Sequence, residues 1–360
     1  MRNKSLMLAA LVVAFALIAA ACGGDETGCK EDEFCACEIS DTGGIDDRSF
    51  NQLAWEGLQD FEAAHPDDVG IDFVESSTAA DYEPNLRAMM DAGCDVTILP
   101  GYLWIETILE FAPANPDSLY AIVDVGGLGV PNLRELTFQT DEASFLAGYL
   151  AAGVTQTGKV GTYGGIQIPT VTIFMDGFAK GVEYYNAQKG TNVEVLGWDV
   201  EAQTGLFTED FEAVDKGQQI TQTLLDEGAD VILPVGGKIG LGACSAIEAA
   251  GGAEAGFYHI GVDKDWNISA EAECGDFTIT SVMKLIDAAV MDTAEGVFAS
   301  GTLPPTYLGT LKNGGVGIAR TGVWEDAVSE ELAGEIAALE AAIIAAESTE
   351  GDALVNFLGG

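Results

Sequence analysis

Hydrophobic and polar positions follow two different periods along this chain. Short apolar, β-branched runs recur from Cys37 onward, and stretches with an apolar residue every three or four positions lie between most of them. The short runs predict buried strands, and the stretches between them predict amphipathic helices. The expected strands are 37–40, 71–75, 96–100, 120–125, 159–163, 193–198, 231–235, 258–262 and 279–282. The expected helices are 49–64, 82–92, 103–111, 142–154, 171–186, 215–227, 240–250, 283–299 and 325–346.

The order of these elements predicts an α/β protein. Strands that alternate with helices form βαβ units, in which neighbouring strands run parallel and helices cover the sheet. The number of strands and a break near 153–158 predict two doubly wound parallel-sheet lobes. Glycine pairs follow several strands, at 43–44, 126–127, 164–165 and 236–237. Ligands of open α/β sheets bind outside the carboxyl ends of the strands, so a site is expected near these glycines.

The start of the chain carries a targeting pattern. Arg2 and Lys4 precede an unbroken apolar run that ends in small residues directly before Cys22. A positive start, a short apolar run and small residues at the cleavage point are typical of a secretory signal peptide. The cysteine resembles the lipidated residue of bacterial lipoproteins. We therefore expect a signal peptide over 1–21, a lipid anchor on Cys22 that holds the protein on the extracytoplasmic face of the cell membrane, and a tether over 22–36. Simple cleavage, with Cys22 as an ordinary thiol, is the alternative.

The composition is strongly acidic, with 58 acidic against 15 basic residues and a formal net charge of −43. A surface of this sign repels nucleic acids and anionic lipid head groups, so neither is expected as a partner. The acidic residues are scattered rather than grouped in runs, which is typical of a solvated surface and not of a disordered acidic tail. Attraction of cationic ligands is the alternative interpretation of this charge.

Six cysteines follow Cys22, at positions 29, 35, 37, 94, 244 and 274. An even number in an exported chain favours disulfides, but the spacing does not determine the pairing. Cys244 and Cys274 flank neighbouring expected strands, so we expect these two to be bonded. Cys35 and Cys37 have no histidine near them in the sequence, which favours a structural role over a metal site.

Few residues suggest catalytic chemistry. His65 and His259 lack companions for a metal site or a nucleophile constellation, and His259, inside an expected strand, is interpreted as structural. The glycine-rich segment 236–242 lacks the residue spacing of a phosphate-binding loop. We therefore expect no enzyme activity, no cofactor and no metal.

The segment DTGGIDDRSFNQLAWEGLQDF, which starts at Asp41, contains more polar and aromatic groups than a helix start requires. Phe50 begins an apolar stripe of helical spacing and can be core, but a side chain in the first turn can also reach past the helix end. Asn51 lies off this stripe in the same turn. Asp46 and Asp47 are the expected helix caps, which leaves Asp41 available for a ligand.

Further segments strengthen the pattern: SSTAADYEPNLRAMMDAGCDVTILPG (76–101), LTFQTDEASFLAGYLAA (136–152), GKVGTYGGIQIPTVTIFMDGFAKGVEYYN (158–186), DEGADVILPVGGKIGLG (226–242), IGVDKDW (260–266) and TSVMK (280–284). Together with the first segment, and in this order, they resemble the basic membrane protein family, the nucleoside-binding lipoproteins of ABC transporters. The resemblance extends from about Glu38 to the end of the chain. It implies the type I periplasmic-binding-protein fold, with two lobes joined by a hinge that the chain crosses several times and a cleft that closes on its ligand.

The same resemblance implies which residues hold the base. Asp41 and Asn51 match positions that form hydrogen bonds with it, and Phe50 matches one of two aromatic residues that enclose it. Phe211 matches the second aromatic residue, although an aspartate of the family pattern is replaced near it. Phe207 therefore stays open as the alternative. A ring stacked on a base contributes roughly 1–3 kcal/mol, whichever base it is.

The rest of the implied site follows other expected strands. Asp124 matches a further acid of the cleft, and Gly236 and Gly237 match backbone that approaches the ligand.

Asp263 and Lys284 match residues that hold the ribose hydroxyls. From its position alone, Asp263 ends a strand and is favoured over Asp265. Lys284 begins an expected helix, where a cation opposes the helix dipole, and this indicates a role in the site. An ordinary surface lysine is the alternative.

These observations predict an extracytoplasmic solute-binding lipoprotein that captures a nucleoside, expected to be a purine nucleoside, and delivers it to an ABC permease. The first lobe is expected over 37–153 with about 264–305, and the second over 154–263 with about 306–360. One alternative is the same fold binding a sugar or another small polar solute. The other is a secreted enzyme, or a ligand sensor without a role in transport.

Overall fold

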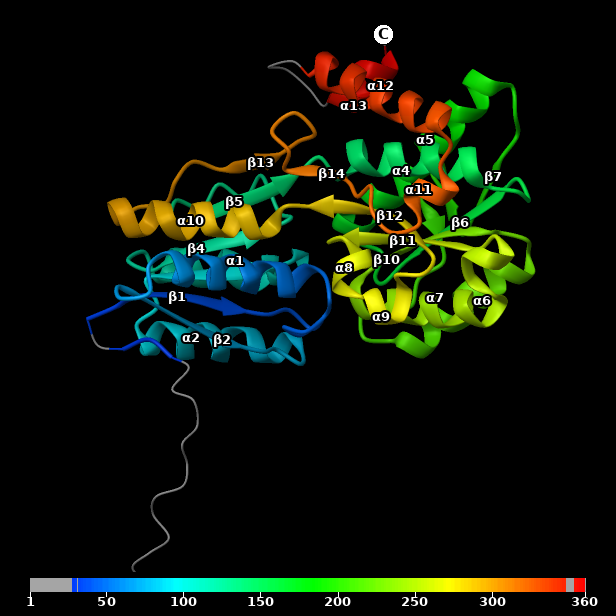
Figure 1. Cartoon of the computed structure of the whole chain (residues 1–360). Helices are drawn as coiled ribbons and strands as arrows, with labels where there is room; N and C mark the ends of the chain where they lie inside the picture. Colours follow the sequence, from blue (N-terminus) through cyan, green and yellow to red (C-terminus); the bar gives the residue numbers. More distant parts are fainter. Residues whose placement is uncertain (1–27, 31, 348–352, 360) are drawn as a thin grey trace, which may run out of the picture.

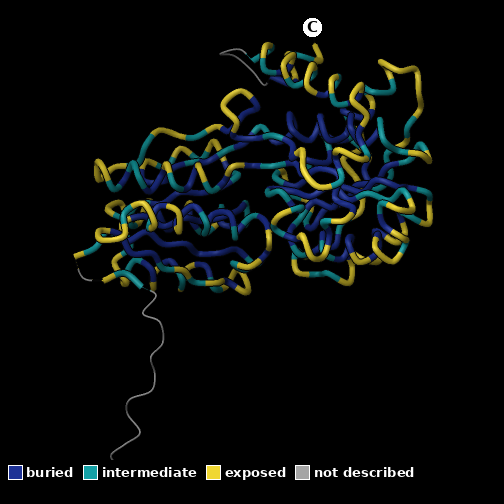
Figure 2. The backbone as a smooth tube through the Cα atoms, in the orientation of Figure 1, coloured by how far each residue is buried: buried dark blue, intermediate teal, exposed yellow. Residues whose placement is uncertain are grey.

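The computed structural model describes residues 28–30, 32–347 and 353–359, so the expected signal peptide and Cys22 lie outside the described part. Two α/β lobes lie side by side, each built on a six-stranded sheet with helices on both faces (Figure 1). The strands run through the dark blue, buried interior of each lobe, and most exposed residues lie in helices and loops (Figure 2). The expected fold class is confirmed.

The sheet of the first lobe is entirely parallel. Its strands are β1 (Phe34–Ile39), β2 (Val69–Val74), β3 (Val96–Pro100), β4 (Leu119–Val123), β5 (Leu133–Phe138) and β13 (Tyr307–Gly309), in the order β13-β5-β4-β3-β1-β2. Its helices are α1 (Phe50–Ala64), α2 (Tyr82–Ala92), α3 (Ile105–Ala114) and α10 (Ile286–Ser300), with short 3₁₀ turns η1 (Ala79–Asp81) and η2 (Tyr102–Trp104). Helices α1 and α10 pack against each other on one face.

The sheet of the second lobe is parallel except for its edge pair β12–β14. Its strands are β6 (Lys159–Gly164), β7 (Glu194–Leu196), β10 (Val231–Val235), β11 (Tyr258–Asp263), β12 (Thr278–Lys284) and β14 (Val316–Ile318), in the order β14-β12-β11-β10-β6-β7. Its helices are α4 (Thr140–Val154), α5 (Pro169–Lys189), α6 (Val214–Asp226), α7 (Gly237–Ala250), α8 (Trp266–Ser269), α9 (Glu271–Cys274), α11 (Trp324–Ala327), α12 (Glu330–Ala346) and α13 (Ala353–Gly359), with the 3₁₀ turn η3 (Gly252–Ala255). A two-stranded ribbon adds β8 (Trp198–Asp199) and β9 (Thr204–Gly205).

Within the described residues the chain passes between the lobes three times, from β5 to α4, from β12 to α10 and from β13 to β14. The first passage lies at 138–140, earlier than the expected break, because α4 packs on α5 of the second lobe. Strand pairing also differs from the expected boundaries. Strand β12, inside 264–305, belongs to the second sheet, and β13, inside 306–360, belongs to the first. Periodicity identifies a strand but does not identify the strand with which it pairs.

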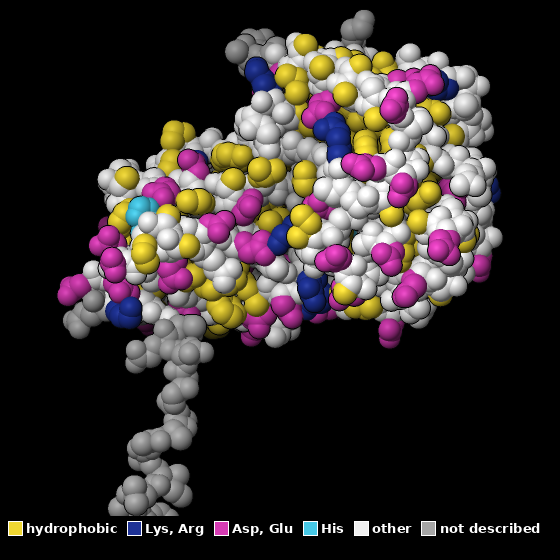
Figure 3. Space-filling view, viewed as in Figure 1, with side chains coloured by type: hydrophobic (Ala, Val, Ile, Leu, Met, Phe, Trp, Pro, Cys, Tyr) yellow, Lys and Arg dark blue, Asp and Glu magenta, His cyan; other side chains and the backbone are white. Residues whose placement is uncertain are grey.

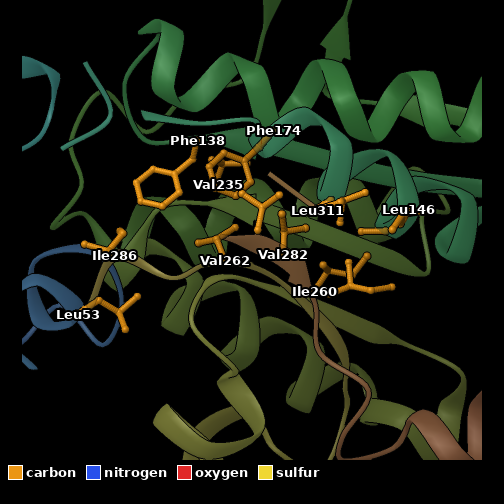
Figure 4. Packing of buried hydrophobic residues seen from close by; sticks show 14 of the residues in the cluster. Leu53, Phe138, Leu146, Phe174, Val235, Ile260, Val262, Val282, Ile286 and Leu311 are labelled. Atoms are coloured by element: carbon orange, nitrogen blue, oxygen red, sulfur yellow. The ribbon is translucent and has the colours of Figure 1, made fainter. Parts of the chain in front are cut away.

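The largest buried cluster includes apolar residues of both lobes and surrounds the passages between them. Leu53 of α1 and Phe138 at the end of β5 contribute from the first lobe, and Ile286 follows the second passage (Figure 4). Val282 and Leu311 lie in the same cluster. The hinge region is therefore held by buried apolar contacts, which are worth about 25 cal/mol per Å² of area removed from water.

Some elements differ from the expectation in detail. The expected helix 325–346 is divided into α11 and α12, because Ser329 caps α12 by accepting a hydrogen bond from the Leu332 backbone N–H at 3.2 Å. Strand β12 continues to Lys284, so α10 begins three residues later than expected. Strands β5, β13 and β14 were not expected. The fold also begins before the end of the expected tether, since β1 starts at Phe34.

Three disulfides link cysteines of the described chain: Cys29–Cys35, Cys37–Cys94 and Cys244–Cys274. The last confirms the expected pair. Two bonds lie in the first lobe and one in the second. Cross-links of this kind stabilise a fold mainly by restricting the unfolded chain.

The surface is acidic over much of the face shown in Figure 3, where acidic side chains outnumber basic ones. In the part of the chain that the structure describes, no helix combines the length and the apolar character needed to cross a membrane.

Candidate ligand-binding site

A pocket lies between the lobes, where strands of both sheets end. Its empty volume is about 570 Å³, including space open to solvent, which is in the usual range for small-molecule sites. All residues expected in the site line this one pocket: Asp41, Phe50, Asn51, Asp124, Phe211, Gly236, Gly237, Asp263 and Lys284. They come together because β1, β3 and β4 of one lobe, and β10, β11 and β12 of the other, point their carboxyl ends at the same space.

A buried network at the start of α1 forms the first-lobe side. Asn51 donates one amide hydrogen to Asp41 Oδ1 at 2.9 Å and the other to Asp47 Oδ2 at 3.0 Å. Its own oxygen accepts the Asp41 backbone N–H at 3.0 Å. Asp41 Oδ1 also accepts the Gly43 backbone N–H at 2.8 Å. Asp41 Oδ2 has no hydrogen-bond partner among the described residues, and it is the free acceptor of this network.

Burial shapes the charge of these acids. It raises the pKa of the Asp41 carboxyl, while the hydrogen bonds from Gly43 and Asn51 act in the opposite direction. It raises the pKa of Asp47 to about 6, against the hydrogen bonds that Asp47 accepts from Asn51 and Ser49. The N-cap residue of α1 is Ser49, but Asp47 accepts three backbone N–H groups at this helix start, from Ser49, Asn51 and Gln52, and so does the work expected of a cap.

Lys284 lies in the middle of the site and is 2% exposed. Its Nζ is 2.5 Å from Asp124 Oδ2 and 3.0 Å from Asp263 Oδ1. It also lies over two aromatic rings, 4.8 Å from the centroid of Phe50 and 5.0 Å from that of Phe174. Burial alone would lower the pKa of Lys284, but the two carboxylates outweigh it and raise that pKa, so the side chain is a cation.

The two acids beside Lys284 share an uncommon backbone conformation. Asp124 has φ of 63° and Asp263 has φ of 65°, in the left-handed region that residues other than glycine rarely adopt. Asp124 follows β4 of the first lobe, and Asp263 ends β11 of the second and accepts a hydrogen bond from Ser49 Oγ at 2.6 Å. Strained residues of this kind cluster at functional sites. Lys284, at the passage from β12 to α10, therefore joins one acid of each lobe.

Phe211 and the strand-end glycines form the second-lobe side. Phe211 lines the pocket, whereas Phe207 packs edge-on against Trp198, with 6.0 Å between the ring centroids. A Cβ atom at Gly165 would lie 2.3 Å from Phe211 Cδ1, so only glycine lets this ring lie against the backbone. Phe50 and Phe211 are both half-buried and enter the pocket from opposite lobes.

The lobes touch at the mouth of the pocket. Lys238 Nζ of the second lobe lies 2.9 Å from Asp46 Oδ1 of the first and 3.0 Å from Glu212 Oε2 of its own lobe. A Cβ atom at Gly237 would lie 2.6 Å from the Asp47 carbonyl oxygen, which shows how closely the start of α7 approaches the first lobe. The structure therefore has its cleft closed around the pocket.

The structure changes two interpretations made from the sequence. Lys284 ends strand β12 and does not begin a helix, so the argument from the helix dipole was wrong. Asp46 pairs with Lys238 and does not cap α1. The sequence analysis missed Phe174 and Lys238 as pocket residues. Phe174 belongs to the apolar stripe of α5 and Lys238 follows two glycines, and neither position carries a local signal.

The family model described as "ABC transporter substrate-binding protein PnrA-like" (Bmp) matches residues 37–349. The "ABC transporter nucleoside-binding protein BmpA" of Lactococcus lactis is 29% identical over 334 residues, which cover 88% of this chain and 91% of that protein. "Basic membrane protein A" of Borreliella burgdorferi is 30% identical over 353 residues, which cover 95% of this chain and 94% of that protein.

Solved structures agree with the architecture. The crystal structure of an ABC transporter solute-binding protein from Aeropyrum pernix K1 superimposes with a TM-score of 0.77 at 24% identity, and covers 90% of this chain and 95% of that one. This likeness shows the fold, which is that of the type I periplasmic-binding proteins. Because the family model spans most of the sequence, this chain belongs to the Bmp family of ABC transporter substrate-binding proteins.

Proposed function

We propose that this protein captures a nucleoside, specifically a purine nucleoside, in the interlobe pocket and delivers it to an ABC permease. The observation that carries the proposal is the pair of half-buried phenylalanines, Phe50 and Phe211, which line one pocket from opposite lobes beside buried acids. Flat heterocycles gain roughly 1–3 kcal/mol for each aromatic contact. The name of the Lactococcus lactis relative, a nucleoside-binding protein, supports the same ligand class.

The polar network supports different tasks for Asp41 and Asn51. Both amide hydrogens of Asn51 are used within the protein, so Asn51 holds Asp41 in place. Asp41 Oδ2 is then the acceptor that faces the ligand. It favours a base with an N–H group at the edge it meets, such as the amino group or protonated ring nitrogen of a purine. A buried acceptor left without a donor costs about 1–3 kcal/mol, which gives selectivity among flat rings.

The sugar is assigned to the charged group around Lys284. The ammonium has three hydrogens; it donates one to Asp124 and forms an ion pair with Asp263, which leaves donor capacity for a ribose oxygen. Asp263 and Asp124 can accept hydroxyl hydrogens of a cis-diol. The acids that line the pocket, including Glu212, repel a phosphate group, so nucleosides should bind in preference to nucleotides.

Ligand capture is a shift between open and closed forms. A nucleoside that touches Phe50 of one lobe and Phe211 of the other stabilises the closed form more than either lobe alone can. The permease would recognise that closed form. The proposed lipid on Cys22, outside the described residues, would keep the protein at the membrane surface, and no bond of the ligand is made or broken.

Calorimetric titration with adenosine, guanosine, inosine, cytidine, uridine and ribose tests the ligand. We expect purine nucleosides to bind most tightly, and Phe50→Ala to weaken them about 5- to 150-fold, the equivalent of roughly 1–3 kcal/mol. Phe73→Ala, which truncates a phenylalanine outside the pocket, is the matched control and should bind normally. Ribose binding as tight as that of any nucleoside, with Phe50→Ala unchanged, would instead indicate a sugar-binding protein.

Two further measurements test the role. Recovery of intact nucleoside after long incubation is expected, and conversion of the nucleoside would indicate an enzyme. Cells without the protein should lose uptake of a labelled purine nucleoside, and wild-type protein should restore it while Phe50→Ala should not. Unchanged uptake in the deletion strain would contradict a role in transport.

A further inference from the structure

A second cluster of reactive side chains lies in the core of the second lobe, away from the ligand pocket. Cys244 belongs to α7, His259 to β11, and Cys274 ends α9. All three are at most 1% exposed. Their two sulfurs and one histidine ring nitrogen lie within 4.8 Å of one another. The sequence predicts the two cysteines as a pair but not His259 beside them, because His259 is distant from both along the chain and only the fold brings it to them.

The hydrogen bonds of His259 determine which ring nitrogen carries the proton. His259 Nδ1 lies 2.9 Å from Thr278 Oγ1. That hydroxyl donates its single hydrogen to the Cys274 carbonyl oxygen at 3.0 Å, so it accepts the hydrogen of Nδ1. Nε2 therefore keeps its lone pair, and this buried atom has no hydrogen-bond partner among the described residues.

A surface hollow borders the cluster at Cys274. Cys274 lines it together with Phe277 and a ring of acidic side chains: Glu248, Glu254, Glu271, Glu273 and Asp276. Acidic walls raise the local concentration of cations, so the hollow is suited to gather metal ions beside Cys274.

We propose that the Cys244–Cys274 disulfide is the oxidised state of a redox-gated metal site, which in its dithiol form binds a thiophilic divalent ion such as Zn²⁺. The two thiolates and His259 Nε2 are the protein ligands, and water takes the fourth position. Tetrahedral ligands at ordinary zinc distances lie roughly 3.5–3.8 Å apart, which the cluster can reach with small side-chain rotations. The Nδ1–H bond to Thr278 is the kind of outer contact that orients a ligating histidine.

The redox step balances with a dithiol as the external reductant. A dithiol reductant gives two electrons and two protons to the disulfide, which becomes two thiols, and the reductant becomes a cyclic disulfide. Zn²⁺ then binds the thiolate forms and releases both thiol protons to solvent. A disulfide oxidant would reverse the sequence: it takes two electrons from the thiolates and two protons from solvent to become two thiols, the Cys244–Cys274 bond forms again, and the ion leaves because the bonded sulfurs no longer act as thiolates.

Cobalt titration tests the proposal, because Co²⁺ bound to thiolates absorbs light where free Co²⁺ does not. The full chain is reduced with dithiothreitol, separated from it under nitrogen and titrated with Co²⁺. The reduced variant C244S/C274S keeps the other disulfide cysteines and is the matched control. We expect reduced wild type to bind one Co²⁺ more than this variant, with tetrahedral absorption that Zn²⁺ abolishes. We also expect oxidised wild type to bind none at this site.

Two variants test the histidine. His259→Ala keeps both thiols and should weaken the extra Co²⁺ site about tenfold or more. Thr278→Val keeps all three proposed ligands but removes the hydroxyl that accepts from Nδ1 and donates to the Cys274 carbonyl oxygen, and it should weaken the site by about 10- to 100-fold, as the loss of outer contacts does. Circular dichroism checks that each variant is folded. Equal Co²⁺ binding by reduced wild type and C244S/C274S would overturn the proposal, and unchanged affinity in both His259→Ala and Thr278→Val would remove histidine from the site.

Discussion

Glu38 is an acid in the middle of a buried strand, and replacing it tests how much the first lobe is destabilised when a buried carboxyl group ionises. It is fully buried in β1, and neither carboxylate oxygen has a hydrogen-bond partner among the described residues. Burial raises the pKa of Glu38 well above its usual value, and the nearby Asp47 and Asp41 raise it further. The carboxyl group therefore stays protonated in the folded protein at pH values where the unfolded chain is ionised.

The sign and size of the effect follow from this difference. A raised folded-state pKa in an acid means that stability is fully present below the unfolded pKa, near 4.3, and is lost as the pH rises towards the folded pKa. Over that interval the loss is about 1.4 kcal/mol per pH unit. Glu38→Gln has a similar shape and does not ionise, so it lacks this loss. The free energy of unfolding of the variant, relative to wild type, should therefore increase by about 1.4 kcal/mol per pH unit above about pH 4.5.

Urea unfolding followed by circular dichroism, at several pH values between 4.5 and 7.5, measures this difference. Asp41 and Asp47 are present in both proteins, so most of their own titration cancels. Glu254→Gln removes an exposed acid and is the control. Its free energy of unfolding, plotted against pH, should run parallel to that of wild type. If the curves of wild type and Glu38→Gln also ran parallel, Glu38 would have a partner for its charge and the reasoning would be refuted.

Other substitutions test the site and the fold. Lys284→Met leaves two buried acids without their cation and should destabilise the protein by about 3–5 kcal/mol in urea unfolding, whereas Lys312→Met at the surface should change little. Lys238→Ala removes an interlobe ion pair and should raise the Kd for the nucleoside a few-fold in calorimetry, with a smaller effect at high salt. The variant C37S/C94S lacks one disulfide, so its free energy of unfolding should be about 2–5 kcal/mol lower than that of oxidised wild type. Reduced wild type also lacks this bond and should be destabilised by at least the same amount.

The sequence predicts most of the fold because its strands are continuous apolar runs. Strand β5 was missed because Arg134 and Glu135 interrupt its pattern. Arg134 is nevertheless buried, since its guanidinium donates to the Pro305 carbonyl oxygen at 2.8 Å and to Thr293 Oγ1 at 2.7 Å. Those partners lie far along the chain, so no local pattern could reveal them.

The candidate site was predictable where its residues end strands. Asp41, Asp124 and Asp263 follow apolar runs, and the ends of parallel strands meet at one edge. Phe174 was not predictable, because an aromatic residue in a helical stripe usually belongs to the core. The sequence also could not predict which lobe each strand joins, because that depends on hydrogen bonds between segments that are distant along the chain.

The positions of the disulfides have a consequence for motion. Each of the three bonds closes a loop inside a single lobe, and none of those in the described chain joins one lobe to the other. Oxidation therefore stiffens the two halves as separate rigid bodies and leaves their relative rotation to the passages between them. A reducing environment should make each lobe less rigid without changing the angle through which the two lobes can rotate apart.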